Sequence, residues 1–121
     1  MDLKINKHQQ SDKEIVVTVA GEIDAYTAPM LREELSPFAE GDNRVIVNLK
    51  NVTYLDSTGL GVFVSLFKQL KKNKGELKLT DLSERLKRLF DITGLSNIMD
   101  ISVNPESDIV DIAANLENGG R

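Results

Sequence analysis

The stretch that decides the fold of this chain reads Tyr54-Leu55-Asp56-Ser57-Thr58-Gly59-Leu60-Gly61. Before it, the segment Arg44–Leu49 is almost continuously apolar and β-branched, a pattern typical of a strand covered on both faces. After it, apolar side chains recur at helical spacing as far as residue 72. The sequence therefore predicts a buried strand followed by an amphipathic helix, with Ser57 at the helix N-terminus.

Four further strands are predicted from alternating or β-branched patterns that are bounded by polar residues and glycine. They are Leu3–Asn6, Glu14–Ala20, Glu76–Thr80 and Met99–Ser102. The first two are expected to form a hairpin across the polar turn His8–Lys13. The loops Gly21–Thr27 and Val52–Ser57 each follow a strand that we expect to be parallel to its neighbour, and binding residues tend to gather at the carboxyl ends of such strands.

Helices are predicted in the intervals between the strands. Thr27 is a candidate N-cap for the first helix, and Pro37 near its C-terminal end is expected to distort or stop it. Ser83–Ile92 forms a later helix that ends at Gly94, and Asn104-Pro105 begins a last one. The alternation predicts an α/β fold, a small mixed and mostly parallel β-sheet of about five strands with about four α-helices. We expect one domain over residues 1–116 and a disordered C-terminal tail over residues 117–121.

The composition excludes several classes of function. Without cysteine, the 121-residue chain has no thiol nucleophile, zinc–thiolate site or disulfide. A net charge of −4 argues against nonspecific nucleic-acid binding, which needs a basic face. No apolar run approaches the ~20 residues that cross a bilayer, and no signal peptide is recognisable at the N-terminus. We therefore expect a cytoplasmic protein with no metal and no cofactor.

Ser57 lacks the surroundings of a catalytic nucleophile. A serine needs a base within hydrogen-bond distance, and the only histidine is His8, far away in the sequence. The stretch also lacks the lysine of a phosphate-binding P-loop. We therefore expect no enzymatic activity. Two interpretations of Ser57 stay open: a helix N-cap, with Gly59 and Gly61 allowing close packing of helix on sheet, or a residue that accepts a phosphate.

A phosphate on Ser57 is expected to act on a binding partner rather than on the fold. A phosphoserine carries about −1.5 to −2 charges, which a helix N-terminus favours and the adjacent Asp56 opposes. These two effects are small and of opposite sign, so the domain should tolerate the modification. A charge left unpaired in an interface can cost ~2–5 kcal/mol, which is roughly a 30- to several-thousand-fold loss of affinity.

Several segments together resemble the STAS domain of bacterial anti-sigma-factor antagonists, and most closely the branch that controls the general stress sigma factor of Gram-positive bacteria. The resemblance covers residues 3–103 and is carried by Gly21-Glu22-Ile23-Asp24, Val45–Leu49, Asp56-Ser57-Thr58-Gly59-Leu60-Gly61 and Leu82–Leu95. It implies that the unphosphorylated chain binds an anti-sigma factor that is also a serine kinase, and thereby releases the sigma factor. It further implies that this kinase inactivates the chain by phosphorylating Ser57, and that a PP2C-type phosphatase restores it.

The resemblance also implies which residues meet the partner. Asp24 and Asp56 match positions at the partner-facing surface, and Thr58 and Gly59 complete the motif around Ser57. Some relatives have serine at the position of Thr58, so the neighbouring hydroxyl is the alternative phosphorylation site. We expect the free protein to be a monomer.

Three rival functions are weighed against the antagonist. The first is a STAS module of a larger stress-signalling assembly, which usually carries an additional N-terminal sensor domain for which this chain has no room. The second is the regulatory domain of an anion transporter, which needs a membrane span. The third is a small enzyme that processes phosphoesters through Ser57.

Overall fold

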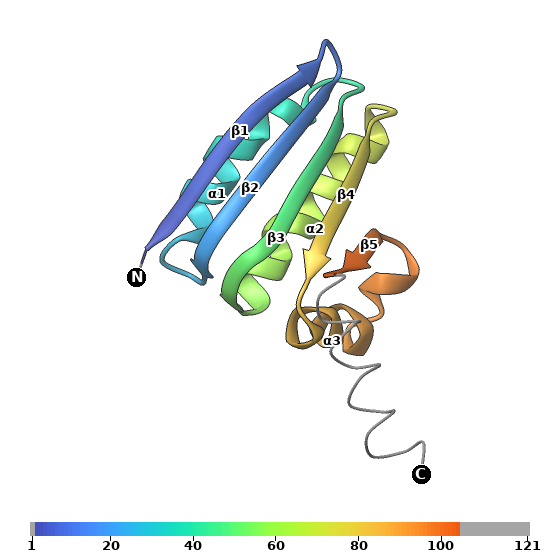
Figure 1. Ribbon diagram of the computed structural model, residues 1–121. Coiled ribbons are helices and arrows are strands. Elements are labelled where there is room, and N and C mark those ends of the chain that lie inside the picture. The colour runs from blue at the N-terminus through green and yellow to red at the C-terminus, as the bar shows by residue number, and fades with distance from the viewer. Residues whose placement is uncertain (1, 105–121) are drawn as a thin grey trace.

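The computed structural model describes residues 2–104, whose strands form one sheet in which the spatial order follows the order along the chain (Figure 1). The strands are β1 (Leu3–Ser11), β2 (Glu14–Ile23), β3 (Arg44–Leu55), β4 (Glu76–Leu82) and β5 (Asp100–Val103). β1 is antiparallel to β2, and the other neighbours are parallel. The predicted α/β fold with a mixed, mostly parallel sheet is confirmed.

The α-helices within residues 2–104 are α1 (Ala28–Leu35), α2 (Ser57–Lys72) and α3 (Glu84–Ile92), accompanied by the short 3-10 helices η1 (Ser36–Ala39) and η2 (Leu95–Asn97). Figure 1 shows α1 and α2 on the same face of the sheet, whereas α3 lies at the end of β4. The helix predicted to begin at Asn104-Pro105 lies outside the described residues, as does the boundary predicted at residue 116.

The hydrophobic core fills the space between the sheet and the helices α1 and α2. Buried residues alternate along β3, where Val45, Val47 and Leu49 point to the helices, while Ile46 between them is only half-buried. The prediction that this strand is covered on both faces was therefore wrong. Ile46 is opposite Val16 of β2, and packing between such β-branched neighbours favours this sequence on an open sheet face.

The strands are longer than the hydrophobic pattern predicted. β1 continues through the expected turn to Ser11, because His8 and the polar residues after it pair with the apolar β2. β2 and β3 likewise reach Ile23 and Leu55, so most of the predicted loop residues extend the sheet. Main-chain hydrogen bonds to a neighbouring strand require no particular side chain. The local sequence pattern therefore predicts strands that are too short.

Pro37 shortens the first helix as predicted. α1 ends at Leu35, and the chain continues as the 3-10 helix Ser36–Ala39, which contains Pro37. A proline in a continuing α-helix would lose the hydrogen bond to the carbonyl four residues earlier and clash with it. The tighter turn keeps Ala39 buried against the core.

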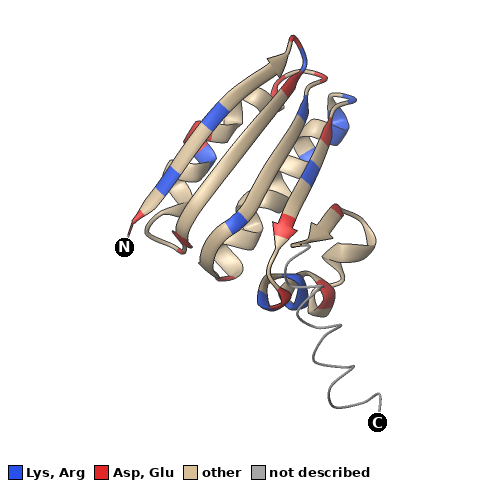
Figure 2. Cartoon of the chain, viewed as in Figure 1, with Lys and Arg blue, Asp and Glu red and all other residues tan. Residues whose placement is uncertain are grey.

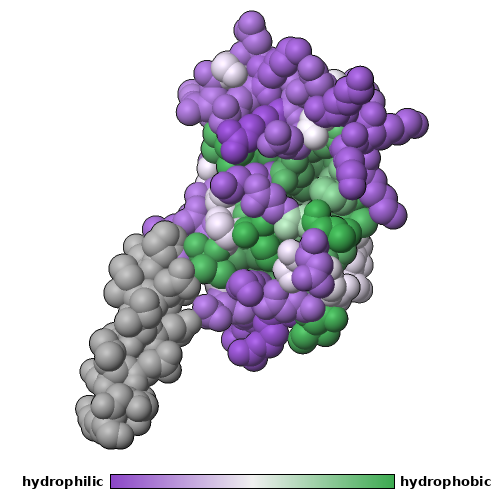
Figure 3. Space-filling model, turned by 90° about the vertical axis from the view of Figure 1, so that its right-hand side faces the viewer, coloured by the Kyte–Doolittle hydropathy of each residue, from purple (hydrophilic) through white to green (hydrophobic). Residues whose placement is uncertain are grey.

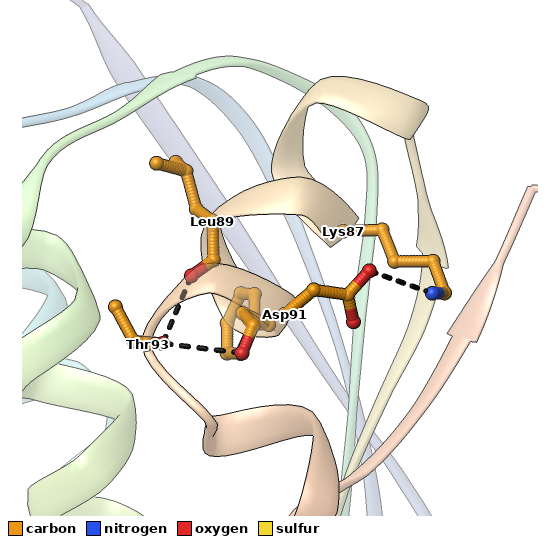
Figure 4. A network of polar contacts seen from close by, with 5 residues as sticks. Lys87, Leu89, Asp91 and Thr93 are labelled. Carbon is orange, nitrogen blue, oxygen red and sulfur yellow. Dashed lines mark hydrogen bonds and ion pairs between the residues drawn. The ribbon is translucent and has the colours of Figure 1, made fainter.

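Helix α3 is held at both of its ends, and Figure 4 shows the contacts in its C-terminal half. Of the two candidate caps in the sequence, Asp81 and Ser83, it is Ser83 that caps the N-terminus, by accepting a 3.2 Å hydrogen bond from a first-turn N–H. Near its C-terminus the Thr93 hydroxyl donates to two main-chain carbonyls at 2.8 and 3.1 Å, and Lys87 donates to Asp91 at 2.9 Å. The hydrogen bond from Lys87 lowers the pKa of Asp91. Gly94, at which the helix was predicted to end, follows with φ 78°, the left-handed conformation that glycine commonly adopts after a helix.

The surface of the described residues is mixed in charge. Figure 2 shows basic and acidic residues interspersed along strands and helices, without a continuous basic stripe in this view. On the face seen in Figure 3, hydrophobic surface forms a band between two hydrophilic ends. A cavity of about 200 Å³ lined by Phe67, Leu77 and Ile98 lies beside β4 and β5. None of the helices described is both long enough and apolar enough to cross a membrane.

Candidate functional site at the N-terminus of α2

The site forms where the carboxyl ends of β2 and β3 meet. Ile23 pairs with Leu55 in the parallel ladder, and the N–H of Asp56 donates to the Ile23 carbonyl at 3.3 Å. The chain then turns into α1 after β2 and into α2 after β3. The two segments that the sequence placed at one sheet edge are therefore joined by a hydrogen bond.

Asp56 is the N-cap of α2. Its backbone is extended (φ −109°, ψ −172°), and its Oδ1 accepts hydrogen bonds from the N–H groups of Thr58 and Gly59 at 3.0 and 3.1 Å. The interpretation of Ser57 as the cap was therefore wrong, because Ser57 is the first residue of the helix. An aspartate caps as well as a serine does, and its charge also suits the helix dipole.

Ser57 is left with an open hydroxyl group. Its side chain is exposed, and the structure records no hydrogen bond for it within the described chain. The same exposure holds for Thr58. Because Asp56 does the capping, either hydroxyl can be modified without removing a side-chain contact that holds the helix.

Gly59 and Gly61 differ although both lie in the first turns of α2. Gly59 is buried, and a Cβ atom placed on it would lie 2.6 Å from Cγ2 of Ile23 and 3.0 Å from the Ile23 carbonyl oxygen. A Cβ atom on Gly61 would meet no atom within 4 Å. The close packing of helix on sheet that the sequence suggested for both glycines therefore depends on Gly59.

The loop between β2 and α1 is held by the side chains of both Asp24 and Thr27. Asp24 Oδ1 accepts hydrogen bonds from the N–H groups of Tyr26 and Thr27 at 2.9 and 3.0 Å. Thr27 stands at the N-cap position but makes no side-chain cap bond there. Its buried hydroxyl donates to the Glu22 carbonyl at 2.7 Å and accepts from the Asp24 N–H at 3.0 Å. The hydrogen bond from the Thr27 N–H is the main cause of a lowered pKa at Asp24.

Two cavities flank the start of α2, and the sequence pointed to neither. One of about 310 Å³ is lined by Ala25, Pro29 and Thr58 together with Arg32. The other is an apolar groove of about 290 Å³ between β3 and α3, with these residues among its lining: Tyr54, Leu55, Arg85, Leu89 and Ile92. The signal in the sequence was the helical spacing of Arg85, Leu89 and Ile92, which places them on one side of α3, next to the face that buries Leu86 and Phe90.

The described residues around Ser57 include no catalytic base of the usual kind. His8 is opposite Val16, seven residues before the end of β2, which is about 23 Å along a strand. No group of three or more His, Cys, Asp or Glu side chains that could hold a metal ion occurs within residues 2–104. The arrangement offers an exposed hydroxyl group beside ordered loops and two cavities, which suits modification and protein binding.

Comparison with known proteins gives a consistent result. The sequence profile of the STAS domain matches residues 4–108. An anti-sigma-B factor antagonist of Bacillus subtilis (strain 168) is 56% identical over 101 residues, which are 84% of this chain and 93% of that protein. The proteins with the same name from Listeria monocytogenes and Staphylococcus aureus (strain NCTC 8325) are 48% and 46% identical, over 84% and 88% of this chain and 90% and 98% of their own lengths.

Solved structures share the fold at low sequence identity. An anti-sigma factor antagonist from Mycobacterium paratuberculosis superimposes with a TM-score of 0.75 at 22% identity, covering 93% of this chain and 95% of that one. The anti-sigma factor antagonist SpoIIAA in its unphosphorylated form gives a TM-score of 0.67 at 16% identity, over 92% and 98% of the two chains. The phosphorylated form of SpoIIAA gives the same TM-score at 21% identity, over 90% and 99%.

Proposed function

This chain belongs to the STAS-domain family, and from that membership together with the geometry at α2 we propose that it is an anti-sigma-factor antagonist. In this proposal the unphosphorylated chain binds an anti-sigma factor and so frees a sigma factor for stress transcription. It is a cytoplasmic regulator without catalytic activity of its own, monomeric when free. The three relatives described above, which share about half of its residues, are anti-sigma-B factor antagonists, and this supports the function.

Phosphorylation of Ser57 is the proposed switch. The anti-sigma factor acts as the kinase: the Ser57 oxygen forms a bond to the γ-phosphorus of ATP, the bond to the β-phosphate oxygen breaks, ADP leaves, and the hydroxyl proton is released. A PP2C-type phosphatase hydrolyses the phosphoserine and restores the active form. ATP and the metal ions for these reactions belong to the partner enzymes.

The observation that carries this proposal is that Asp56 caps α2, whereas the side chain of Ser57 is exposed. Asp56 already accepts the hydrogen bonds of Thr58 and Gly59, so a phosphate on Ser57 finds those two donors occupied. Its charge of about −1.5 to −2 therefore stands beside a carboxylate and faces outward. Such a charge leaves the fold intact and opposes a partner that covers the site, by ~2–5 kcal/mol when it is buried unpaired.

The remaining residues of the proposed partner-binding surface have different roles. Thr58 offers an exposed side chain next to Ser57, whereas Gly59 contributes by seating the first turn of α2 on the sheet. Asp56 holds the same turn through its cap. Asp24 orders the neighbouring loop. Together they present Ser57 on a rigid edge, which limits the entropy lost when a partner binds.

The direct test is to incubate the purified protein with the anti-sigma-B factor that the 56% identical relative antagonises, and with ATP, and to map the phosphate by peptide mass. We expect one phosphate on Ser57 and loss of the complex. Ser57→Ala should bind the anti-sigma-B factor, and its complex should persist in the presence of ATP. Thr58→Val is the control variant, which should still be phosphorylated. Phosphate on Thr58 would move the switch by one residue.

Two results would contradict the proposal. A complex that persists in ATP without any phosphate would make the chain a plain interaction domain. Turnover of a generic phosphoester by the purified protein, lost in Ser57→Ala, would instead support an enzyme.

A further inference from the structure

Tyr26 has an aromatic side chain that is exposed to solvent. It is 89% exposed, more than any other large hydrophobic residue within residues 2–104. A side chain so exposed contributes little to the core. Tyrosine, tryptophan and arginine are the residues that most often dominate the binding energy of protein interfaces.

The backbone that carries Tyr26 is fixed. The Tyr26 N–H donates to Asp24 Oδ1 at 2.9 Å, and the next N–H, from Thr27, donates to the same oxygen at 3.0 Å. The Thr27 hydroxyl ties this turn to the end of β2 through the Glu22 carbonyl at 2.7 Å. These bonds fix the point at which the Tyr26 side chain leaves the loop, so a partner that binds it orders less backbone and loses less entropy.

Tyr26 also lies next to the proposed switch. Its neighbour Ala25 lines the cavity of about 310 Å³ that is also lined by Thr58, the residue after Ser57. The hydrogen bond between Asp56 and Ile23 holds the two loops together. The loop that carries Tyr26 therefore lies beside the turn that carries Ser57.

We propose that Tyr26 is the aromatic anchor of the partner-binding surface, and that its ring enters an apolar pocket of the anti-sigma factor. Asp24 is then a positioning residue, which acts through the hydrogen bond to the Tyr26 backbone instead of through contact with the partner. This inference rests on the proposed function. It adds an apolar contact with the anti-sigma factor beside the phosphorylation site. The phosphate on Ser57 then weakens a complex whose affinity comes largely from the neighbouring loop.

Binding of the unphosphorylated protein to the anti-sigma-B factor, measured by calorimetry, tests the anchor. We expect Tyr26→Ala to weaken binding by at least about 30-fold, the range of an interface hot spot, and Tyr26→Phe to stay near wild type. The melting temperature of Tyr26→Ala should not change. Ile98→Ala is the matched control. Ile98 is 60% exposed, but it shares a cavity with Lys71, which lies about 21 Å from Ser57 along the α2 helix.

A double-mutant cycle tests the role of Asp24. If Asp24 acts by positioning Tyr26, Asp24→Ala weakens the binding of wild type but adds little to Tyr26→Ala. Additive losses would show direct contact between Asp24 and the partner, and would overturn the positioning role. Wild-type affinity in Tyr26→Ala, alongside lost binding in Ser57→Asp, would overturn the anchor and leave the proposed function standing. Absence of any complex with the wild-type protein would overturn both.

Discussion

Replacing Gly59 with alanine tests how closely α2 is seated on the sheet. The added Cβ atom would lie 2.6 Å from Cγ2 of Ile23, 3.0 Å from the Ile23 carbonyl oxygen, and in contact with Cδ1 of Leu55. The Leu55 methyl group can rotate away, but Ile23 is β-branched and its carbonyl belongs to the end of β2. Either the helix or the strand must move, and such overpacking costs about 1–3 kcal/mol.

Gly61→Ala is the matched control in the same helix. No atom lies within 4 Å of its added Cβ, so the substitution brings only the higher helix propensity of alanine, about 0.8–1 kcal/mol. Gly59→Ala has the same propensity gain, and the difference between the two variants therefore isolates the overpacking. We expect Gly61→Ala to be more stable than wild type, and Gly59→Ala to melt at least about 4 °C below Gly61→Ala.

Urea and thermal unfolding followed by circular dichroism measure this difference in the free energy of unfolding. The urea slope should be the same for both variants if only the native state has changed. Equal stability of the two variants, or a more stable Gly59→Ala, would refute the close contact between α2 and Ile23. It would also leave the glycine that follows Ser57 and Thr58 without a steric explanation.

Three further predictions concern the polar groups at the site. Asp56→Ala should lower the free energy of unfolding by about 0.5–2 kcal/mol, the usual cost of a lost cap, in the same urea experiment. Ser57→Ala should change it by less than about 0.5 kcal/mol; the reverse order of the two would identify Ser57 as the cap. The lowered pKa of Asp24 means that its carboxylate adds stability above its ordinary pKa of 3.8, and that this stability is lost as the pH falls through the lower folded value. The melting temperature of wild type should therefore exceed that of Asp24→Asn near neutral pH and converge with it in acid, and a constant difference across the titration would contradict this.

Much of the fold followed from local patterns. The β-branched run of β3, the helical spacing after Ser57, the cap at Ser83 and the left-handed Gly94 are all determined by residues close together in the sequence. Local preference and final structure agree at these places because each pattern matches one backbone geometry. The sequence also placed the two loops at one sheet edge, since parallel strands end at the same side.

The roles of individual residues at the site needed more than local patterns. Asp56 and Ser57 are both good cap residues, and the extended backbone of Asp56 at the end of β3 decides which of them caps. Nothing near Tyr26 in the sequence shows that its ring stays in solvent, because that depends on what other elements leave uncovered.

The sequence by itself determined that a strand ends and the central helix begins near Ser57, because the spacing of hydrophobic residues changes there from a strand pattern to a helix pattern. Only the tertiary structure decided that Asp56 holds the helix, that Gly59 must lack a side chain, and that residues 2–104 leave one face of the sheet open. The physical reason is distance along the chain. Gly59 lies against Ile23, 36 residues earlier, and such contacts depend on how strands pair and helices cross over them.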